Sequence, residues 1–183
     1  MQRISFSFAM ATVILLMACC YGIAMAARNN RNCDNIRADD ENGESVICGR
    51  VTFVNDGDTL RLSPDGRRNS ASLRIRLLEI DAPELNQRHG AEARDALRYM
   101  APTGSRVCIL VDNEDIYGRL LGRVCRGGAD LNLRLLEDGH VWCYRGRCRS
   151  AYRTAELQAR SSRRGLWSDP TAQAPWLFRK QKG

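Results

Sequence analysis

Histidine is scarce in this sequence, and cysteines spaced as zinc ligands are missing. The chain contains two histidines, His89 and His140, and no pair of cysteines separated by two residues. Structural zinc sites draw four ligands from closely spaced Cys and His, so the pattern argues against a zinc-binding module. No internal repeat is evident, and 183 residues suffice for one ordinary domain but not for two comfortable ones.

Charge is missing from the beginning of the chain. Residues 4–23 carry no charged side chain and are mostly apolar, and residues 24–26 (Ala-Met-Ala) resemble a signal-peptide cleavage site. We therefore predict that residues 1–26 form a signal peptide and that the protein is secreted or periplasmic. Two alternatives stay open. The run approaches the ~20 residues that span a bilayer, and Cys19 follows a loose lipoprotein motif that would give a lipid anchor.

The composition changes twice after the apolar segment. Residues 27–45 are rich in Asn, Arg, Asp and Glu, which is typical of a polar linker. Residues 46–170 carry alternating strand patterns and helical stripes and are predicted to form one folded domain. Residues 171–183 are predicted to form a C-terminal tail, and the Trp and Pro around its beginning indicate a packed but irregular end.

Six of the eight cysteines lie after the predicted signal peptide: Cys33, Cys48, Cys108, Cys125, Cys143 and Cys148. An even number in an exported chain indicates disulfides, although six cysteines permit 15 pairings that sequence alone does not separate. We take as hypotheses the two local pairs, Cys33–Cys48 and Cys143–Cys148. The third hypothesis is Cys108–Cys125, because these residues flank a predicted hairpin turn.

Strand patterns dominate the predicted domain. The strands are expected at about residues 46–54, 59–62, 73–80, 107–111 and 120–125, with helices at 90–100, 131–138 and 150–163. Five short strands with a helix inserted after the third fit a Greek-key barrel. The predicted fold class is therefore α+β, mainly β: a five-stranded OB-type Greek-key barrel with about three α-helices.

Three acidic residues are expected to meet at one rim of this barrel. Asp58 begins the second strand and Asp81 ends the third, and neighbouring antiparallel strands bring such positions together. Two close carboxylates need a counter-ion, and oxygen ligands favour a hard cation such as calcium. Glu84 follows across a proline turn, where it can orient and deprotonate a water molecule. Taken singly, each is also an ordinary turn or surface residue.

Two arginines complete the candidate site. Arg76 and Arg74 alternate with Ile75 and Leu77, so both arginines are expected on the outer face of the third strand. Arg119 follows the Tyr-Gly turn between the last two strands. A guanidinium holds two phosphate oxygens at once and stabilises charge that develops on them. The net charge of +7 agrees with a polyanionic partner, although it is equally explained by solubility.

Three segments of the chain resemble the signature blocks of the thermonuclease family, the staphylococcal nuclease-like proteins. They are NDGDT at residues 55–59, RLLEIDAPE at 76–84 and YGR at 117–119, in the family's order and spacing. The resemblance covers about residues 47–170. It implies an OB-type barrel and a nuclease that hydrolyses DNA and RNA with calcium and leaves 3′-phosphate ends.

The resemblance also implies roles for individual residues. The two carboxylate ligands of calcium correspond to Asp58 and Asp81, and a backbone carbonyl ligand corresponds to Ala82. The catalytic residues correspond to Arg76, Glu84 and Arg119. Tyr117 and Tyr144 correspond to the side of the site that contacts the nucleotide.

Departures from the family pattern affect the substrate pocket. Ile116 stands where the staphylococcal enzyme has a lysine, and the second of two pocket tyrosines is missing, since Arg145, Gly146 and Arg147 follow Tyr144. Two further hypotheses stay open. One is a non-catalytic nucleic-acid-binding module of the OB type, and the other is a disulfide-bonded envelope protein whose basic face binds an anionic polymer. Neither the sequence nor the family pattern implies an obligate protein partner, and we expect a monomer.

Overall fold

The computed structural model describes Cys33, residues 45–66 and residues 71–182. The predicted signal peptide, the alternative anchors and most of the predicted linker lie outside these residues. Within the described residues, no helix combines the length and apolar character needed to cross a bilayer.

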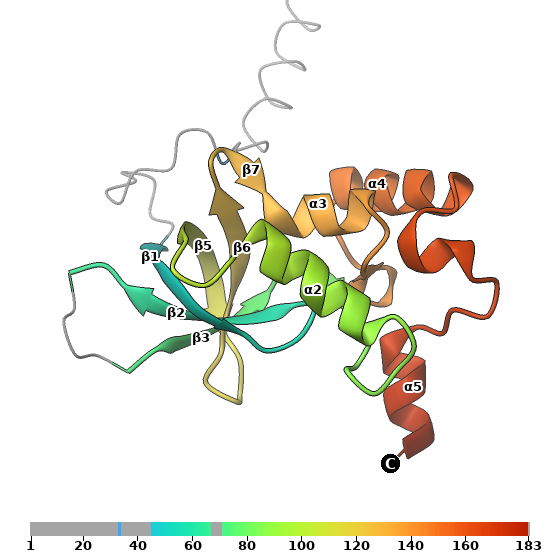
Figure 1. Ribbon diagram of the computed structural model, residues 1–183, viewed down its shortest axis with the longest axis horizontal. Coiled ribbons are helices and arrows are strands. Elements are labelled where there is room, and N and C mark those ends of the chain that lie inside the picture. Colours follow the sequence, from blue (N-terminus) through green and yellow to red (C-terminus); the bar gives the residue numbers. More distant parts are fainter. Residues whose placement is uncertain (1–32, 34–44, 67–70, 183) are drawn as a thin grey trace, which may run out of the picture. The chain divides into compact units, whose positions relative to one another are not determined.

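Five strands close into a barrel (Figure 1), which confirms the predicted fold class. Antiparallel pairing gives the order β3-β2-β1-β5-β6, and a parallel pairing of β3 with β6 closes the sheet. The strands are β1 (Ser45–Val54), β2 (Thr59–Pro64), β3 (Leu73–Leu77), β5 (Arg106–Glu114) and β6 (Leu120–Arg126). A short strand, β7 (Ala129–Asp130), pairs antiparallel with the end of β6.

Helices cover one side of the barrel. They are α2 (Gly90–Met100), α3 (Leu131–Glu137), α4 (Ser150–Ser161) and α5 (Pro175–Lys182), with short 3₁₀ turns η1 (Tyr144–Gly146) and η2 (Gly165–Ser168). The first three confirm the predicted helices. The fourth corrects the prediction of an irregular tail, because residues 175–182 form a helix that follows a cluster of tryptophans, in which Trp142 contacts Trp167 and Trp176 edge-on.

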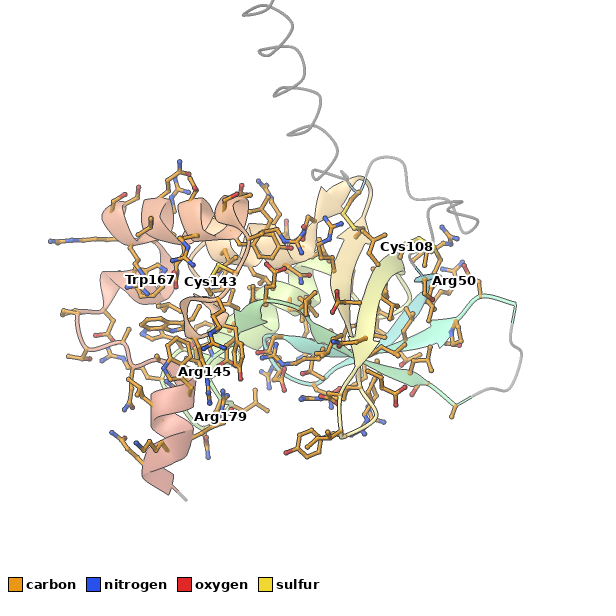
Figure 2. The ribbon with its side chains drawn as sticks, turned by 180° about the vertical axis from the view of Figure 1, so that it is seen from behind. Arg50, Cys108, Cys143, Arg145, Trp167 and Arg179 are labelled. Carbon is orange, nitrogen blue, oxygen red and sulfur yellow. A yellow bond between two sulfur atoms is a disulfide. The ribbon has the colours of Figure 1, made fainter. Side chains whose placement is uncertain are left out.

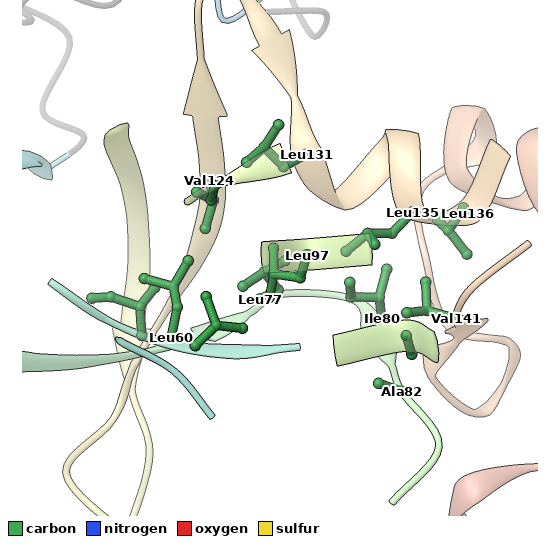
Figure 3. Packing of buried hydrophobic residues seen from close by; sticks show 14 of the residues in the cluster. Leu60, Leu77, Ile80, Ala82, Leu97, Val124, Leu131, Leu135, Leu136 and Val141 are labelled. Atoms are coloured by element: carbon green, nitrogen blue, oxygen red, sulfur yellow. The ribbon is translucent and has the colours of Figure 1, made fainter. Parts of the chain in front are cut away.

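The core lies between the barrel and the helices (Figure 3). Along β3 the side chains alternate, so that Ile75 and Leu77 are fully buried while Arg74 and Arg76 lie on the opposite face of the strand. Leu97 of α2 and Leu135 of α3 are likewise inaccessible to solvent. This packing fixes the rim of the barrel at which the acidic residues meet.

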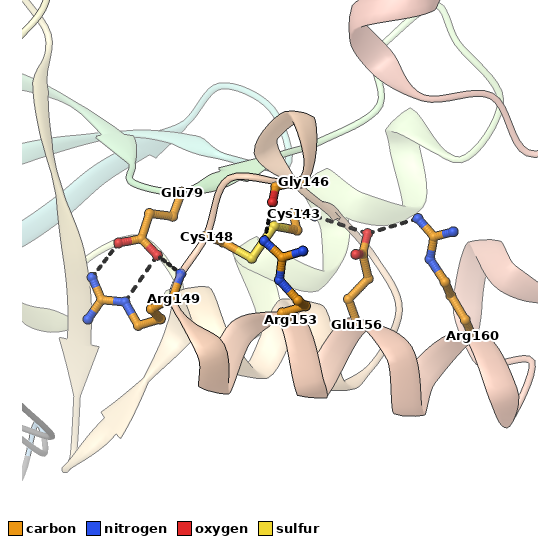
Figure 4. Close-up of a disulfide and its surroundings, with 8 residues drawn as sticks. All are labelled: Glu79, Cys143, Gly146, Cys148, Arg149, Arg153, Glu156 and Arg160. Carbon is orange, nitrogen blue, oxygen red and sulfur yellow. Dashed lines mark hydrogen bonds and ion pairs between the residues drawn. A yellow bond between two sulfur atoms is a disulfide. The ribbon is translucent and has the colours of Figure 1, made fainter. Parts of the chain in front are cut away.

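The predicted third strand is divided in two by the structure. β3 ends at Leu77, the backbone reverses at Glu79 with a left-handed φ of 64°, and β4 (Ile80–Asp81) pairs instead with β8 (Trp142–Cys143). The carboxylate of Glu79 accepts hydrogen bonds from the backbone and guanidinium of Arg149 (Figure 4), which holds the reversal in place. The mostly apolar run of residues 77–80 (Leu-Leu-Glu-Ile) looks like a continuation of the strand and contains no Gly, Pro or Asn, so no turn signal is present here in the sequence.

The disulfide pairing differs from two of the three hypotheses. Cys143–Cys148 is confirmed (Figure 4), whereas the other two bonds are Cys33–Cys125 and Cys48–Cys108. The barrel explains the correction. In its strand order β5 lies between β1 and β6, so Cys108 has Cys48 opposite it on one side and Cys125 on the other. The hairpin predicted Cys125 as the partner of Cys108, but the disulfide joins Cys108 to Cys48 of β1 (Figure 2 labels Cys108).

Candidate active site

The turn that precedes β2 positions the first carboxylate. Gly57 lies so close to its neighbours that an added Cβ would come within 2.7 Å of the Cβ atoms of Ala82 and Ala93. This contact brings Asp58 beside Ala82, whose backbone N–H donates to Asp58 Oδ2 at 2.6 Å. The N–H of Asp58 in turn donates to Asp56 Oδ1 at 3.0 Å, and burial together with the charge of Asp58 raises the pKa of Asp56 to about 7.

Arg76 joins the two central carboxylates. Its Nη1 lies 3.0 Å from Asp58 Oδ2 and its Nη2 lies 2.9 Å from Asp81 Oδ1. Asp58 and Asp81 are both buried, and the Arg76 side chain is only 13% exposed. The planar guanidinium therefore bridges two negative groups that would otherwise repel each other at close range. The predicted convergence of Asp58, Asp81 and Arg76 is observed.

Asp81 enters the cluster from β4 and not from the end of β3. Its backbone is paired with Trp142 of β8, and its side chain is only 1% exposed. Burial raises the pKa of the Asp81 carboxyl, and hydrogen bonds and ion pairs from arginines oppose that rise. A carboxylate in this setting requires positive charge next to it in order to stay ionised.

Glu84 occupies the loop between β4 and α2. An added Cβ on Gly90 would approach the Glu84 carbonyl oxygen to 1.9 Å, so the helix can begin there only with glycine. Gln87 holds the same loop by accepting from the Glu84 N–H at 3.2 Å and by donating to the carbonyl of Gln173 at 2.6 Å. The Glu84 carboxylate stays 40% exposed at the surface of the cluster, where substrate and water can reach it.

A second guanidinium reaches the cluster from the C-terminal helix. Arg179 of α5 donates through Nη2 to Asp81 Oδ2 at 2.7 Å and through Nη1 to Glu84 Oε1 at 2.7 Å. Sequence reasoning missed this residue, because the predicted domain ended at residue 170. The sequence shows only that Arg179 follows the tryptophans of the tail, and this does not predict that its side chain reaches the carboxylates (Figure 2 labels Arg179).

Arg119 lies outside this cluster. Its guanidinium binds Asp115, with Nε donating to Oδ2 at 2.8 Å, and it lies 5.6 Å from the centre of the Tyr117 ring. Among the described residues, no hydrogen bond or ion pair joins it to Asp58, Asp81 or Glu84. The parallel register pairs Ile75 of β3 with Leu120 of β6, and Arg119 directly precedes that first residue of β6.

The two tyrosines occupy different places. Tyr117 is 65% exposed at the tip of the β5–β6 hairpin, whereas Tyr144 begins η1 directly after β8. The N–H of Tyr144 donates to the carbonyl of Glu79 at 2.9 Å, so its backbone is fixed near the carboxylates. The backbone of Tyr144 is thus tied to Glu79, two residues before Asp81.

The donor chemistry of the cluster fits a hard divalent cation. Asp58 and Asp81 supply buried carboxylate oxygens, the ligand type that calcium prefers. Within the described residues, no three His, Cys, Asp or Glu side chains gather closely enough to hold a metal on their own. The remaining ligands would therefore include water and a backbone carbonyl, such as that of Ala82.

The protein is thus an OB-type barrel protein that carries an arginine-bridged pair of buried carboxylates at its rim. Comparison with known proteins identifies the family. The family model described as staphylococcal nuclease homologue matches residues 74–169. The chain is 36% identical over 148 residues to an "Uncharacterized endonuclease" of Escherichia coli O157:H7, covering 75% of this chain and 90% of that protein.

Two further relatives agree with this match. A "Micrococcal nuclease" of Shigella flexneri is 37% identical over 144 residues, covering 72% of this chain and 80% of that protein. A "Staphylococcal-like nuclease" of Arabidopsis thaliana is 38% identical over 115 residues, covering 60% of this chain and 34% of that protein. The chain therefore belongs to the staphylococcal nuclease family. Arg179 lies beyond the segment that the family model matches.

Proposed function

We propose that this protein is an exported, calcium-dependent nuclease that hydrolyses phosphodiester bonds of DNA and/or RNA. The observation that carries the proposal is the Asp58–Arg76–Asp81 cluster with Glu84 at its exposed edge. Membership of the staphylococcal nuclease family supports it. The three disulfides support export, because such bonds persist in oxidising compartments.

Metal binding in this proposal involves the two buried carboxylates and one carbonyl. Asp58, Asp81 and the backbone oxygen of Ala82 would hold the ion, with water as the remaining ligands. When bound, calcium neutralises charge on the phosphate and lowers the pKa of a coordinated water. Arg179 donates to both carboxylate oxygens of Asp81, so its guanidinium would have to move to let these oxygens hold an ion.

The chain's own residues supply the remaining chemistry. Glu84 accepts a proton from the attacking water and orients it in line with the scissile bond. Arg76 binds a non-bridging phosphate oxygen and stabilises the charge that grows on it. Arg119, from the turn between β5 and β6, exchanges Asp115 for the phosphate of the substrate. As the family resemblance implies, attack of the water on phosphorus breaks the P–O5′ bond, so the products carry a 3′-phosphate and a 5′-hydroxyl end.

Substrate contacts outside the reaction centre are assigned to the tyrosines. Tyr117 and Tyr144 are both exposed enough to stack against a base or sugar. In this proposal the substrate is a nucleic acid. The protein acts as a monomer and needs no obligate protein partner.

The direct test is an incubation of the purified, oxidised protein with plasmid and single-stranded DNA, with calcium or with a chelator. Cleavage that requires calcium supports the proposal. A lack of cleavage with every divalent cation would refute it.

One observation favours a different function. Arg179 neutralises Asp81 and Glu84 as a purely structural arginine would, and such a cluster suits a non-catalytic nucleic-acid-binding module. This alternative predicts tight binding of nucleic acid without cleavage under any metal condition.

A further inference from the structure

A cleft lies beside the carboxylate cluster, between the η1 loop and the C-terminal helix. Its volume is about 620 Å³, and it is lined by Arg145, Trp176, Leu177, Arg179 and Lys180. Three of these five residues are cationic and none is acidic. The remaining two provide an apolar wall, so the cleft combines positive charge with an aromatic surface. This combination is typical of surfaces that bind single-stranded nucleic acid.

Two of the cations are available to a ligand. Arg145 and Lys180 are exposed, and among the described residues neither forms an ion pair with an acidic side chain. The Arg145 guanidinium lies 5.5 Å from the centre of the Tyr144 ring, which leaves its N–H groups free to donate. By contrast, Arg179 is already neutralised by Asp81 and Glu84. The net positive charge of the cleft therefore comes from Arg145 and Lys180.

The loop that carries Arg145 is held in one conformation. The Cys143–Cys148 disulfide closes it, and Arg153 of α4 donates to the carbonyl of Gly146 (Figure 4). The backbone of Arg145 has a left-handed φ of 48°, which non-glycine residues adopt rarely and keep only where the surroundings fix them. The backbone at Arg145 therefore loses little conformational freedom when the side chain binds an anion.

The cleft is continuous with the reaction centre. Arg179 lines the cleft and also donates to Asp81 and Glu84, so one guanidinium belongs to both surfaces (Figure 2). A polymer whose scissile phosphate lies at Glu84 therefore extends into the cleft with its adjoining residues. A mononucleotide or a single phosphodiester would not reach it.

We infer that this cleft is an accessory binding site for the phosphates of a single-stranded polynucleotide, with Arg145 and Lys180 as its phosphate contacts. The inference rests on the proposed function, because it extends the path of the same substrate beyond the reaction centre. Phosphate contacts of this kind raise affinity and fix the register of the strand without reading its sequence. Selection for long single strands over short fragments follows from the position of the cleft.

The test uses the full chain with its disulfides formed and measures binding separately from cleavage. Fluorescence anisotropy of a labelled single-stranded 12-mer is recorded in chelator, over a series of salt concentrations. We expect the Arg145→Ala/Lys180→Ala variant to bind about tenfold more weakly at low salt. The slope of log affinity against log salt should fall in magnitude by about 1.4, since each single-strand phosphate contact contributes roughly 0.7.

A matched control removes the same charge elsewhere. Arg98 and Arg134 are each 60% exposed on α2 and α3, outside the cleft. The Arg98→Ala/Arg134→Ala variant should keep the slope within about 0.3 of wild type. Equal losses in the two double variants would overturn the inference. Arg145→Lys should retain most of the affinity, because a phosphate contact needs the charge. A loss equal to that of Arg145→Ala would also overturn it.

The test of the accessory site and the test of the proposed nuclease activity can fail independently. If the protein cleaves no nucleic acid but the cleft variant shows the expected slope, the nuclease proposal fails and the binding site stands. If cleavage requires calcium and the variant binds as the control does, the nuclease proposal stands and the accessory site is wrong.

Discussion

The rim of the barrel and the C-terminal helix each supply an arginine to the same carboxylates, and they do so in different ways. Arg76 lies near the end of β3, its side chain is 13% exposed, and it bridges two buried carboxylates. Arg179 comes from α5, is 44% exposed and joins Asp81 to Glu84. The first is fixed by the pairing of the sheet, whereas the second depends on how the tail docks. We conclude that the contact of Arg76 with the carboxylates is part of the stable fold, whereas the contact of Arg179 can be displaced by a ligand.

The largest effect is expected from Arg76→Ala. This variant leaves Asp58 and Asp81 buried without their bridge, which should lower the free energy of unfolding in chelator by about 3 kcal/mol. It should also abolish most cleavage, because the phosphate loses its fixed guanidinium. Urea unfolding and a cleavage assay measure both effects. An Arg76→Ala variant with the activity and stability of the wild type would contradict a structural and catalytic role of the Arg76 contact.

Arg119→Ala separates activity from stability. Its partner Asp115 lies on a hairpin, and an ion pair at such a site contributes about 0–1 kcal/mol, so the fold should be unaffected. If the guanidinium stabilises transition-state charge, cleavage should slow by about 100- to 1,000-fold. Steady-state kinetics with an oligonucleotide give the number. A loss of less than about fivefold would assign Arg119 to surface binding instead.

Arg179→Ala tests whether the helix contact is replaceable. The variant lacks the guanidinium that competes with the metal for the carboxylates of Asp81 and Glu84. Calcium should therefore bind about tenfold more tightly. Isothermal titration calorimetry measures this directly, without substrate. Arg179→Lys keeps the charge and serves as the control, with affinity close to wild type. Weaker calcium binding in Arg179→Ala would mean that the helix supports the site and does not compete with it.

The smallest effect concerns the docking of the tail through Asp169. Hydrogen bonds from Thr171 and His89 lower the pKa of Asp169 to about 2, from an ordinary value of 3.8. Because the folded-state pKa is depressed, this contact stabilises docking above about pH 4, and the contribution is lost as the pH falls towards 2. Hydrogen exchange of the α5 amides should therefore accelerate in Asp169→Asn at pH 6. Asp95→Asn, which alters an exposed ion pair on α2, is the control and should leave α5 unchanged.

Much of the barrel rim could be predicted from the sequence. The positions of Asp58 and Arg76 follow from strand alternation and turn residues, which act over a few residues. The reversal at Glu79 could not be predicted in the same way. It depends on a backbone conformation that is stabilised by Arg149, a residue 70 positions away in the chain.

The tail and the disulfides show the same limit. Pairing of Cys48 with Cys108 follows from the β1–β5 neighbourhood, which only the closed barrel creates. The contact of Arg179 with Asp81 spans 98 positions and depends on how α5 docks. Local patterns predict which residues form a strand or helix, but contacts between distant segments depend on packing that no local pattern contains.

The turnover of Glu84→Gln tests the central claim most directly. The substitution keeps the size and polarity of the side chain but removes its ability to accept a proton. With saturating calcium and DNA, we expect the cleavage rate to fall by about 100- to 10,000-fold while the thermal unfolding midpoint stays near that of wild type. A variant that turns over at the wild-type rate would contradict the assignment of this rim as the site of phosphodiester hydrolysis.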